Sequence, residues 1–232
     1  MRKAVLLVAG GTGTRMGSNV PKQFLHIQGK PVIIRTIEQF ISWDPAIEVI
    51  ISIYPAAKTA LEQLLIEWLP GQHISIVAGG ATRTLSVWNG ISELYHHSQQ
   101  PSEVMLFIHD AVRPIIHHSV LNQNYTTAIQ HGNAVSCVPV KSSLRRKTES
   151  GSVAVDRSAY YHVQTPQTFL LSDFYEKMQQ RPHDDFTDDA SLAEACGAHI
   201  FVSEGSYDNI KITTPDDIQL AEQLLKVHDT RN

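Results

Sequence analysis

The sequence predicts an α/β fold in which helices cover both faces of a mostly parallel, doubly wound sheet. Apolar runs alternate with amphipathic segments, and strands joined through helices require right-handed crossovers that leave the strands parallel. The 232 residues are 42% hydrophobic, which suffices for one large core, so we expect a single domain over residues 1–232. The expected strands are 3–9, 47–53, 73–77, 103–108 and 133–138, and the helices between them are 31–42, 56–68, 83–97 and 118–131.

Residues that favour helix starts support several of these elements. Proline suits the first helical position, so we expect Pro31 to begin helix 31–42 and Pro215 to begin the last helix, with Thr214 as its N-cap. Thr82 is an expected N-cap of helix 83–97, and Thr187 of the helix that follows it. The C-terminal part is expected to contain helices 171–180, 187–197 and 215–228 and a strand at 199–203.

Residues 139–165 interrupt the alternation and are expected to leave the globular body as a β-hairpin. The segment is polar and basic, and two short strand-like stretches are joined by a Glu-Ser-Gly-Ser turn at residues 149–152. A long excursion without a core of its own is usually functional, disordered or docked on a partner subunit.

The overall composition excludes some partners. A net charge of −4 and a pI of about 6.3 argue against a nucleic acid or a membrane surface as the main partner. The two cysteines, Cys137 and Cys196, lie in apolar surroundings, which is ordinary for a reducing compartment. We find neither a signal peptide nor an apolar run of 18 residues, so we expect a cytoplasmic protein.

A glycine-rich loop after the first strand predicts a phosphate site. Residues 9–17 read Ala-Gly-Gly-Thr-Gly-Thr-Arg-Met-Gly, and Pro-Lys-Gln follows at 21–23. Glycines let backbone N–H groups approach phosphate oxygens, and Arg15 and Lys22 add positive charge. The loop lacks the lysine spacing of a Walker A motif, and Met16 replaces the third glycine of a dinucleotide fingerprint. We therefore expect it to bind a nucleoside triphosphate.

Asp110 is the candidate metal ligand. It follows the strand 103–108, and ligands of such sheets bind beyond the carboxyl ends of the strands, so Asp110 should share a crevice with the glycine loop. Mg²⁺ prefers one or two carboxylates together with phosphate oxygens and water. The alternative is a structural carboxylate that caps its loop or pairs with Arg113.

Three further positions could face the same crevice. Gly79-Gly80 leads into a helix that carries Arg83 and Ser86, and this segment could recognise a base or could simply cap the helix. Lys211 lies between isoleucines and faces either solvent or a site. Thr187 could bind a phosphate instead of capping a helix.

Six short motifs are spread over nearly the whole chain. Their occurrence together and in this order is more specific than any single motif. In this order they resemble the 2-C-methyl-D-erythritol 4-phosphate cytidylyltransferase family. The motifs are Ala9–Met16 with Pro21-Lys22-Gln23, His109–Pro114, Val155-Asp156-Arg157, Gln164–Phe169, Thr187–Ser191 and Asp208–Lys211.

The resemblance implies a Rossmann-like, three-layer αβα nucleotidyltransferase of the glycosyltransferase-A type with a protruding β-hairpin arm. It implies that CTP and the polyol phosphate react with Mg²⁺ to give the CDP-alditol and pyrophosphate, and that the arm at about 139–165 joins a homodimer. The implied catalytic residues are Arg15, Lys22, Lys211 and Arg157. The implied nucleotide-binding residues are Ala9, Gly10, Gly11, Gly80, Arg83 and Ser86. The implied polyol phosphate ligands are Asp110, Arg113, Ser143, Arg157 and Thr187, with Asp110 also at the metal.

Two alternatives remain open from the sequence. The stretch Ala9-Gly10-Gly11 is closer to ribitol-5-phosphate cytidylyltransferases, which perform the same chemistry on another polyol phosphate. Ala81 stands where the family usually has an acidic residue, and Ser142-Ser143 replaces Asp-Thr, although Ser143 keeps a hydroxyl. A non-catalytic nucleotide-binding protein is disfavoured, because Lys22, Asp110 and Lys211 are all present.

Overall fold

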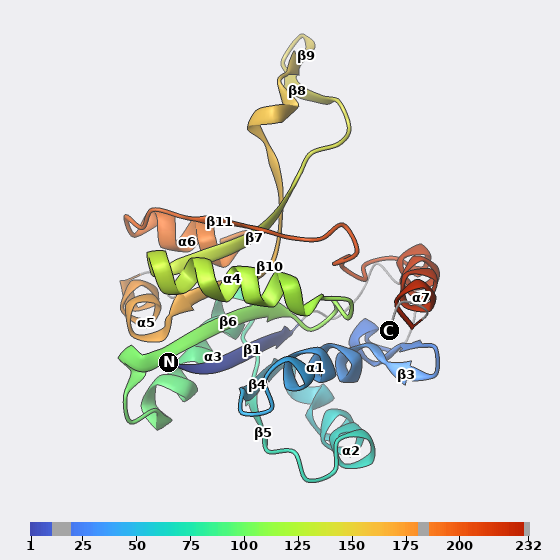
Figure 1. Cartoon of the computed structure of the whole chain (residues 1–232), viewed down its shortest axis with the longest axis vertical. Helices are drawn as coiled ribbons and strands as arrows, with labels where there is room; N and C mark the ends of the chain where they lie inside the picture. Colours follow the sequence, from blue (N-terminus) through green and yellow to red (C-terminus); the bar gives the residue numbers. More distant parts are fainter. Residues whose placement is uncertain (11–19, 181–185, 230–232) are drawn as a thin grey trace.

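A seven-stranded, mostly parallel sheet forms the centre of the protein. The computed structural model describes residues 1–10, 20–180 and 186–229 (Figure 1). The sheet has the order β11-β7-β10-β6-β1-β4-β5, and only β10 runs antiparallel to its neighbours. Its strands are β1 (Arg2–Ala9), β4 (Glu48–Ile53), β5 (Ile74–Ala78), β6 (Val104–Asp110), β7 (Asn133–Pro139), β10 (Tyr161–Leu170) and β11 (Val202–Glu204).

Helices cover both faces of this sheet, which confirms the predicted three-layer αβα arrangement (Figure 1). Side chains of β1 alternate between the two faces: Val5 and Leu7 pack under α1, α2 and α4, whereas Ala4 and Leu6 pack under α3, α5 and α6. The helices are α1 (Val32–Trp43), α2 (Lys58–Trp68), α3 (Arg83–His97), α4 (His118–His131), α5 (Leu171–Gln180), α6 (Asp189–Ala195) and α7 (Pro215–Asp229).

Short elements connect the main ones. The ribbon of β2 (His26–Ile27) and β3 (Lys30–Pro31) lies beside α7, and its Ile27 joins the small apolar cluster of that helix. The 3₁₀ turns are η2 (Lys22–Phe24), η3 (Pro55–Ala57), η4 (Pro101–Glu103) and η5 (Arg157–Ala159). The described part of the chain contains no helix with the length and apolar character that crossing a bilayer requires.

The predicted hairpin arm is present and projects away from the sheet (Figure 1). It consists of β8 (Leu144–Thr148) and β9 (Gly151–Val155), and Glu149 and Ser150 form the two-residue turn. Its expected bounds were too wide, because β7 reaches Pro139 and β10 already begins at Tyr161. Residues 161–165 therefore belong to the sheet, and the arm spans 140–160.

Several helix starts differ from the expectation by one or two residues. Pro31 has an extended backbone and precedes α1 as its N-cap. Thr187 does not cap α6, because Asp188 does so and forms a reciprocal capping box with Ser191. Thr82 caps α3 as predicted, through a hydrogen bond from Leu85 N–H. Pro215 begins α7 as predicted.

The hydroxyl of Thr214 does not accept a helix N–H in the expected way. Instead, the carboxylate of Asp217 accepts the backbone N–H of Thr214 at 2.7 Å and its hydroxyl at 3.0 Å. The first turn of α7 is thus fixed by the acidic residue within it.

Phe107 is the main contact between β6 and the helices on one face. Its ring is fully buried and lies edge-on to Trp43 at 5.3 Å and to Phe40 at 6.5 Å. We expect Phe107→Ala to lower the free energy of unfolding by about 3–5 kcal/mol, because the site loses packing and keeps a cavity. Urea denaturation measures this change. Ile66→Ala, at a side chain that is 76% exposed, serves as the control and should change stability by less than about 0.5 kcal/mol.

Candidate active site

The expected crevice lies at the carboxyl edge of the parallel strands. A cavity of about 390 Å³ opens beyond the ends of β1, β5 and β6. Of the positions that the sequence singled out there, Thr187 does not line this cavity. The other described positions do: Ala9, Gly10, Lys22, Gly80, Arg83, Ser86, Asp110 and Lys211. Segments far apart in the sequence therefore meet in one place, as predicted. We call this the first cavity.

A second cavity of about 320 Å³ adjoins the first. It is lined by Arg113 and Thr187, together with residues of β10, and it shares Arg83, Asp110 and Lys211 with the first cavity. The three shared residues form a common wall that carries two cations and one carboxylate. Two ligands bound side by side would meet at this wall.

The glycine turn after β5 is packed too tightly for any side chain. A Cβ atom on Gly80 would lie 2.3 Å from Leu85 Cβ and 2.9 Å from its carbonyl carbon, and one on Gly10 would lie 2.9 Å from Ser86 Oγ. The Ser86 hydroxyl accepts a hydrogen bond from Gly80 N–H and donates one to the Thr82 carbonyl. Ser86 thus shapes the turn through local bonds while it lines the first cavity.

Lys22 reaches the first cavity from η2. The neighbouring side chain, Gln23, is buried and donates a hydrogen bond from Nε2 to the carbonyl of Ala9, at 3.2 Å. This bond fixes the start of η2 against the end of β1. It explains how a residue outside the sheet is placed in the cavity.

Asp110 is a buried carboxylate with two cationic partners. Its Oδ2 atom lies 3.0 Å from Arg113 Nε and 3.1 Å from Lys211 Nζ. Burial alone would raise the pKa of Asp110, but the charges of Lys211, Arg113 and Arg83 outweigh it and hold this pKa well below its ordinary value. The pairing with Arg113, which the sequence left as the alternative to a metal site, is present, and the carboxylate remains ionised at neutral pH.

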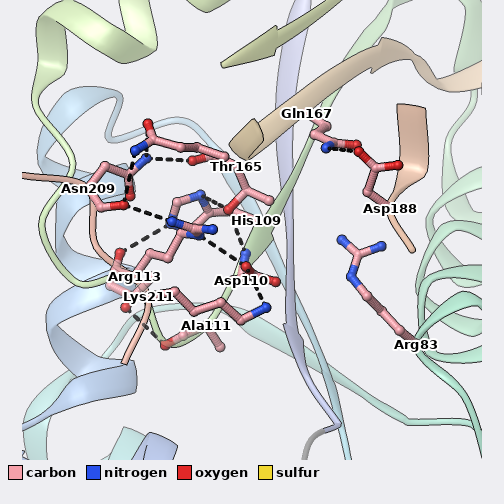
Figure 2. A network of polar contacts seen from close by, with 12 residues as sticks. Arg83, His109, Asp110, Ala111, Arg113, Thr165, Gln167, Asp188, Asn209 and Lys211 are labelled. Carbon is pink, nitrogen blue, oxygen red and sulfur yellow. Dashed lines mark hydrogen bonds and ion pairs between the residues drawn. The ribbon is translucent and has the colours of Figure 1, made fainter. Parts of the chain in front are cut away.

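Lys211 lines both cavities, and its side chain is 40% exposed, so of the two possibilities that the sequence left open it takes the one in which the lysine points into a site. The following residue, Ile212, is fully buried, and its N–H donates to the carbonyl of Val112 at 2.9 Å. Arg113 Nη1 donates to the carbonyl of Asn209 at 2.7 Å (Figure 2). The segment that carries Lys211 is therefore fastened on both sides of the lysine.

The sequence analysis assigned no role to Thr165 or Asn209, which complete this arrangement. Asn209 is fully buried and donates to the carbonyl of Thr165 at 2.7 Å. The Thr165 hydroxyl accepts a hydrogen bond from Asp110 N–H at 3.1 Å (Figure 2). A threonine and an asparagine within polar motifs give no sign in the sequence that they will be buried.

His109 is fully buried below this site. Its Nε2 atom lies 3.2 Å from the carbonyl of Arg113, which can only accept, so Nε2 carries the proton. Its Nδ1 atom then accepts from the Thr165 hydroxyl at 3.0 Å. Burial lowers the pKa of His109 to about 4, so the ring is neutral at pH 7.

Arg83 lines both cavities but is already paired. Its guanidinium makes two parallel hydrogen bonds to the carboxylate of Asp189, at 2.8 and 2.7 Å. The sequence analysis left Asp189 without a role, although it lies within the Thr187–Ser191 motif.

Two of the remaining predicted residues, Ser143 and Arg157, are not brought to the two cavities within one chain. Both lie on the exposed arm. Arg157 Nη1 donates to the carbonyl of Lys141 at the base of the arm. Gly11 and Arg15 lie outside the residues that the structure describes.

Asp110 was predicted to be a metal ligand, and its surroundings bear on that prediction. Among the described residues there is no group of three or more His, Cys, Asp or Glu side chains that could hold a metal. Asp110 Oδ1 accepts no hydrogen bond from these residues, since the contacts of Arg113 and Lys211 are to Oδ2. One carboxylate with phosphate oxygens and water is a donor set that Mg²⁺ accepts.

These features define a class of protein. A Rossmann-like αβα sheet whose carboxyl edge carries a glycine turn, two lysines and a buried carboxylate beside two adjoining cavities is the arrangement of a nucleotidyltransferase.

Comparisons with known proteins identify the family. The family model for 2-C-methyl-D-erythritol 4-phosphate cytidylyltransferase matches residues 3–227. The curated proteins of that name from Bacteroides thetaiotaomicron and Bacteroides fragilis are 38% and 39% identical over 225 and 229 residues, covering 97% of this chain and 100% of each relative. The chain belongs to the 2-C-methyl-D-erythritol 4-phosphate cytidylyltransferase family and is a cytidylyltransferase.

A solved structure supports the fold. The crystal structure of 4-diphosphocytidyl-2C-methyl-D-erythritol synthase from Anaerococcus prevotii superposes with a TM-score of 0.82 at 24% identity, covering 97% of this chain and 96% of the other.

The neutral state of His109 predicts a pH dependence of stability. The unfolded chain should bind a proton at this histidine near pH 6.5, whereas the folded chain does so only near pH 4. The free energy of unfolding should therefore fall as the pH is lowered through this window, and less steeply in His109→Gln. Urea denaturation at several pH values measures both slopes.

An NMR titration tests the same point without relying on the fold of a variant. The ring signal that is missing from His109→Gln identifies His109 among the 12 histidines. This signal should stay unshifted down to about pH 5, and a midpoint near the ordinary pKa of 6.5 would contradict the burial argument.

Proposed function

We propose that this chain transfers CMP from CTP to 2-C-methyl-D-erythritol 4-phosphate, with the nucleotide in the first cavity and the polyol phosphate in the second. The observation that carries the proposal is the wall that the two cavities share, formed by Arg83, Asp110 and Lys211. The glycine turn at Gly80 offers close backbone contact to a base, and Lys22 lies in the same cavity. The second cavity offers Arg113 and Thr187 to a phosphorylated polyol.

The reaction follows from the charges of its partners. An oxygen of the polyol phosphate attacks the α-phosphorus of CTP, a new P–O bond forms, and the bond to pyrophosphate breaks. The attacking phosphate is already an anion, so no side chain has to remove a proton. The difficulty is repulsion between two anions, and fixed cations in a cavity reduce it most effectively. We assign this role to Lys22 and Lys211, and to Arg15 in the glycine loop.

We propose Mg²⁺ as the metal cofactor, held by Asp110 together with phosphate oxygens of the nucleotide. When bound, the ion would neutralise charge on the triphosphate. Asp110 also keeps Lys211 and Arg113 in fixed positions, because both contact its Oδ2 atom. The carboxylate can serve both purposes because it is ionised at neutral pH.

The alternative acceptor, ribitol 5-phosphate, is less well supported. The family model and the curated relatives carry the name of the methylerythritol enzyme. Pyrophosphate release from CTP with each polyol phosphate in turn decides between the two acceptors. Release with neither would leave only nucleotide binding.

We also propose that the protein is a homodimer joined through the arm at residues 140–160. Large apolar side chains are exposed on the arm and at its base, which suits a partner surface: Val153, Tyr160, Tyr161 and Val163. Arg157 and Ser143 lie outside the cavities of their own chain, so they would serve the site of the partner subunit. Two free cysteines suit the reducing cytoplasm, which we propose as the location.

Replacing Lys22 tests the proposed chemistry. We expect Lys22→Ala to lower turnover by about 10²–10³-fold, because one fixed cation at the reacting phosphates is lost. Pyrophosphate release under saturating CTP and 2-C-methyl-D-erythritol 4-phosphate measures it. Lys58→Ala, at an exposed lysine on α2, is the control and should retain full turnover. Near-normal turnover in Lys22→Ala would contradict the assignment.

A mixing experiment tests the shared site. Arg157→Ala and Lys22→Ala should each be nearly inactive as homodimers. In a mixed dimer, one of the two sites has an intact Lys22 and receives Arg157 from the other chain. Equal amounts that exchange subunits freely should therefore recover about one quarter of wild-type activity. No recovery, in a mixture that sedimentation and tagged capture show to contain mixed dimers, would contradict the shared site.

A further inference from the structure

Arg83, which lines both cavities, forms an ion pair with Asp189, which lines neither. Arg83 begins α3, directly after the glycine turn, and Asp189 begins α6, directly after Thr187 and Asp188. Their side chains meet through two hydrogen bonds of 2.8 and 2.7 Å. The Asp189 side chain is only 4% exposed, so the pair is largely removed from water.

The arrangement fixes the geometry of both partners. A planar guanidinium that meets a carboxylate through two parallel bonds allows little rotation, and a lysine could not reproduce this fork. Because Asp189 is buried, it would remain an unpaired charge if Arg83 moved away to follow a ligand. Arg83 is therefore held in place by its own chain and is poorly suited to act as a mobile phosphate ligand.

The two segments that carry Arg83 and Asp189 are held in place by different further contacts. The glycine turn on the Arg83 side is held by its own bonds, from Gly80 N–H to Ser86 Oγ, from Ser86 Oγ to the Thr82 carbonyl, and from Leu85 N–H to Thr82 Oγ1. None of these bonds involves Asp189.

The segment around Thr187 and Asp188 is held by contacts with residues that are distant in the sequence. Gln167 on β10 donates to Asp188 and accepts from the backbone of Ala190, at 2.9 and 2.8 Å. Figure 2 shows Gln167 and Asp188 in contact, with the Arg83 guanidinium directed toward the Asp188 segment. Phe186 N–H also donates to Thr84 Oγ1 at 3.3 Å, and Ala190, Leu192 and Ala193 of α6 pack into the core. Together with these contacts, the pair with Arg83 fixes where the Thr187–Asp188 segment stands relative to the common wall.

We propose that the Arg83–Asp189 ion pair positions the acceptor cavity, and that both are positioning residues for the polyol phosphate. Arg83, predicted from the sequence to bind the nucleotide, instead holds the Thr187–Asp188 segment at a set distance from Lys211. The proposal rests on the proposed assignment of the second cavity to the polyol phosphate. It adds to that assignment a residue, Asp189, that touches neither reacting phosphate.

Steady-state kinetics with each substrate varied in turn tests the proposal. In Asp189→Asn and Arg83→Lys we expect the KM for 2-C-methyl-D-erythritol 4-phosphate to rise by about tenfold or more, and the KM for CTP to stay within about twofold. The KM is independent of how much of the protein is folded, so loss of stability alone cannot produce this split. Asp173→Asn is the matched control, since Asp173 forms a pair of the same length, 2.7 Å, with Lys177 on the exposed face of α5. It should change neither KM.

A double variant guards against misfolding of the single ones. Arg83→Met combined with Asp189→Leu replaces the buried pair by apolar side chains, a change that proteins often accept without loss of stability. Its melting temperature should remain near that of the wild type while the acceptor KM still rises. A wild-type acceptor KM in this folded variant would overturn the proposal. A rise in the CTP KM alone, or an equal rise in both, would also overturn it.

The proposed function can fail separately. If the wild type releases no pyrophosphate with the polyol phosphate, the reaction assignment is wrong. Calorimetric binding of CTP and of the polyol phosphate to the same variants then tests the ion pair by itself, with the same split expected in the two dissociation constants.

Discussion

The site depends on one buried carboxylate, Asp110. A charge removed from water must be paired, and here two cations from different parts of the chain meet the same oxygen. Arg113 comes from the loop after β6, and Lys211 comes from the segment before α7. The pairing therefore joins the centre of the sheet to the C-terminal part of the chain. It also keeps the Lys211 amine in the wall of both cavities before any substrate arrives, which is the kind of preorganisation that lowers the barrier to attack between anions.

The polar surroundings of Asp110 follow from the topology of the sheet. The antiparallel strand β10 enters between β6 and β7, and it brings Gln164, Thr165 and Gln167 under the cavities as buried polar side chains. Each has hydrogen-bond partners: Thr165 with His109 and Asp110, Gln164 with the 206–209 segment, and Gln167 with the Asp188 segment. Buried polar groups that are satisfied in this way hold their neighbours more rigidly than apolar contacts would. The strand thus supports both the common wall and the second cavity.

The sequence predicted the parallel part of the sheet because its strands are apolar and are separated by helices with a clear period. It missed β10 as a strand because residues 161–170 are largely polar and contain Pro166, so no apolar alternation marks them. Asp110 and Lys211 could be found because charged residues next to apolar stretches are unusual, and Lys22 because it adds positive charge after a glycine-rich loop. Thr165, Asn209 and Asp189 could not, since their roles come from contacts with residues that lie 44 to 106 positions away: Asn209 bonds to Thr165 across 44 positions, Thr165 to Asp110 across 55, and Arg83 to Asp189 across 106. 

One part of the site is held by local contacts and the other by long-range contacts. This difference explains why the sequence could not decide between two acceptors, 2-C-methyl-D-erythritol 4-phosphate and ribitol 5-phosphate. The glycine turn after β5, residues 79–86, is held by hydrogen bonds among its own residues. Both candidate reactions use CTP, so a motif that serves the nucleotide carries no information about the polyol. The second cavity, which we assign to the acceptor, is assembled from β10, the Thr187 segment, Arg113 and Lys211. A difference in acceptor would be built into these separate segments, and the glycine loop after β1 could stay the same. The resemblance of Ala9-Gly10-Gly11 to the ribitol enzymes therefore bears on nucleotide binding, which both reactions share. The identity of the acceptor has to be judged from the second cavity and from the residues that position it.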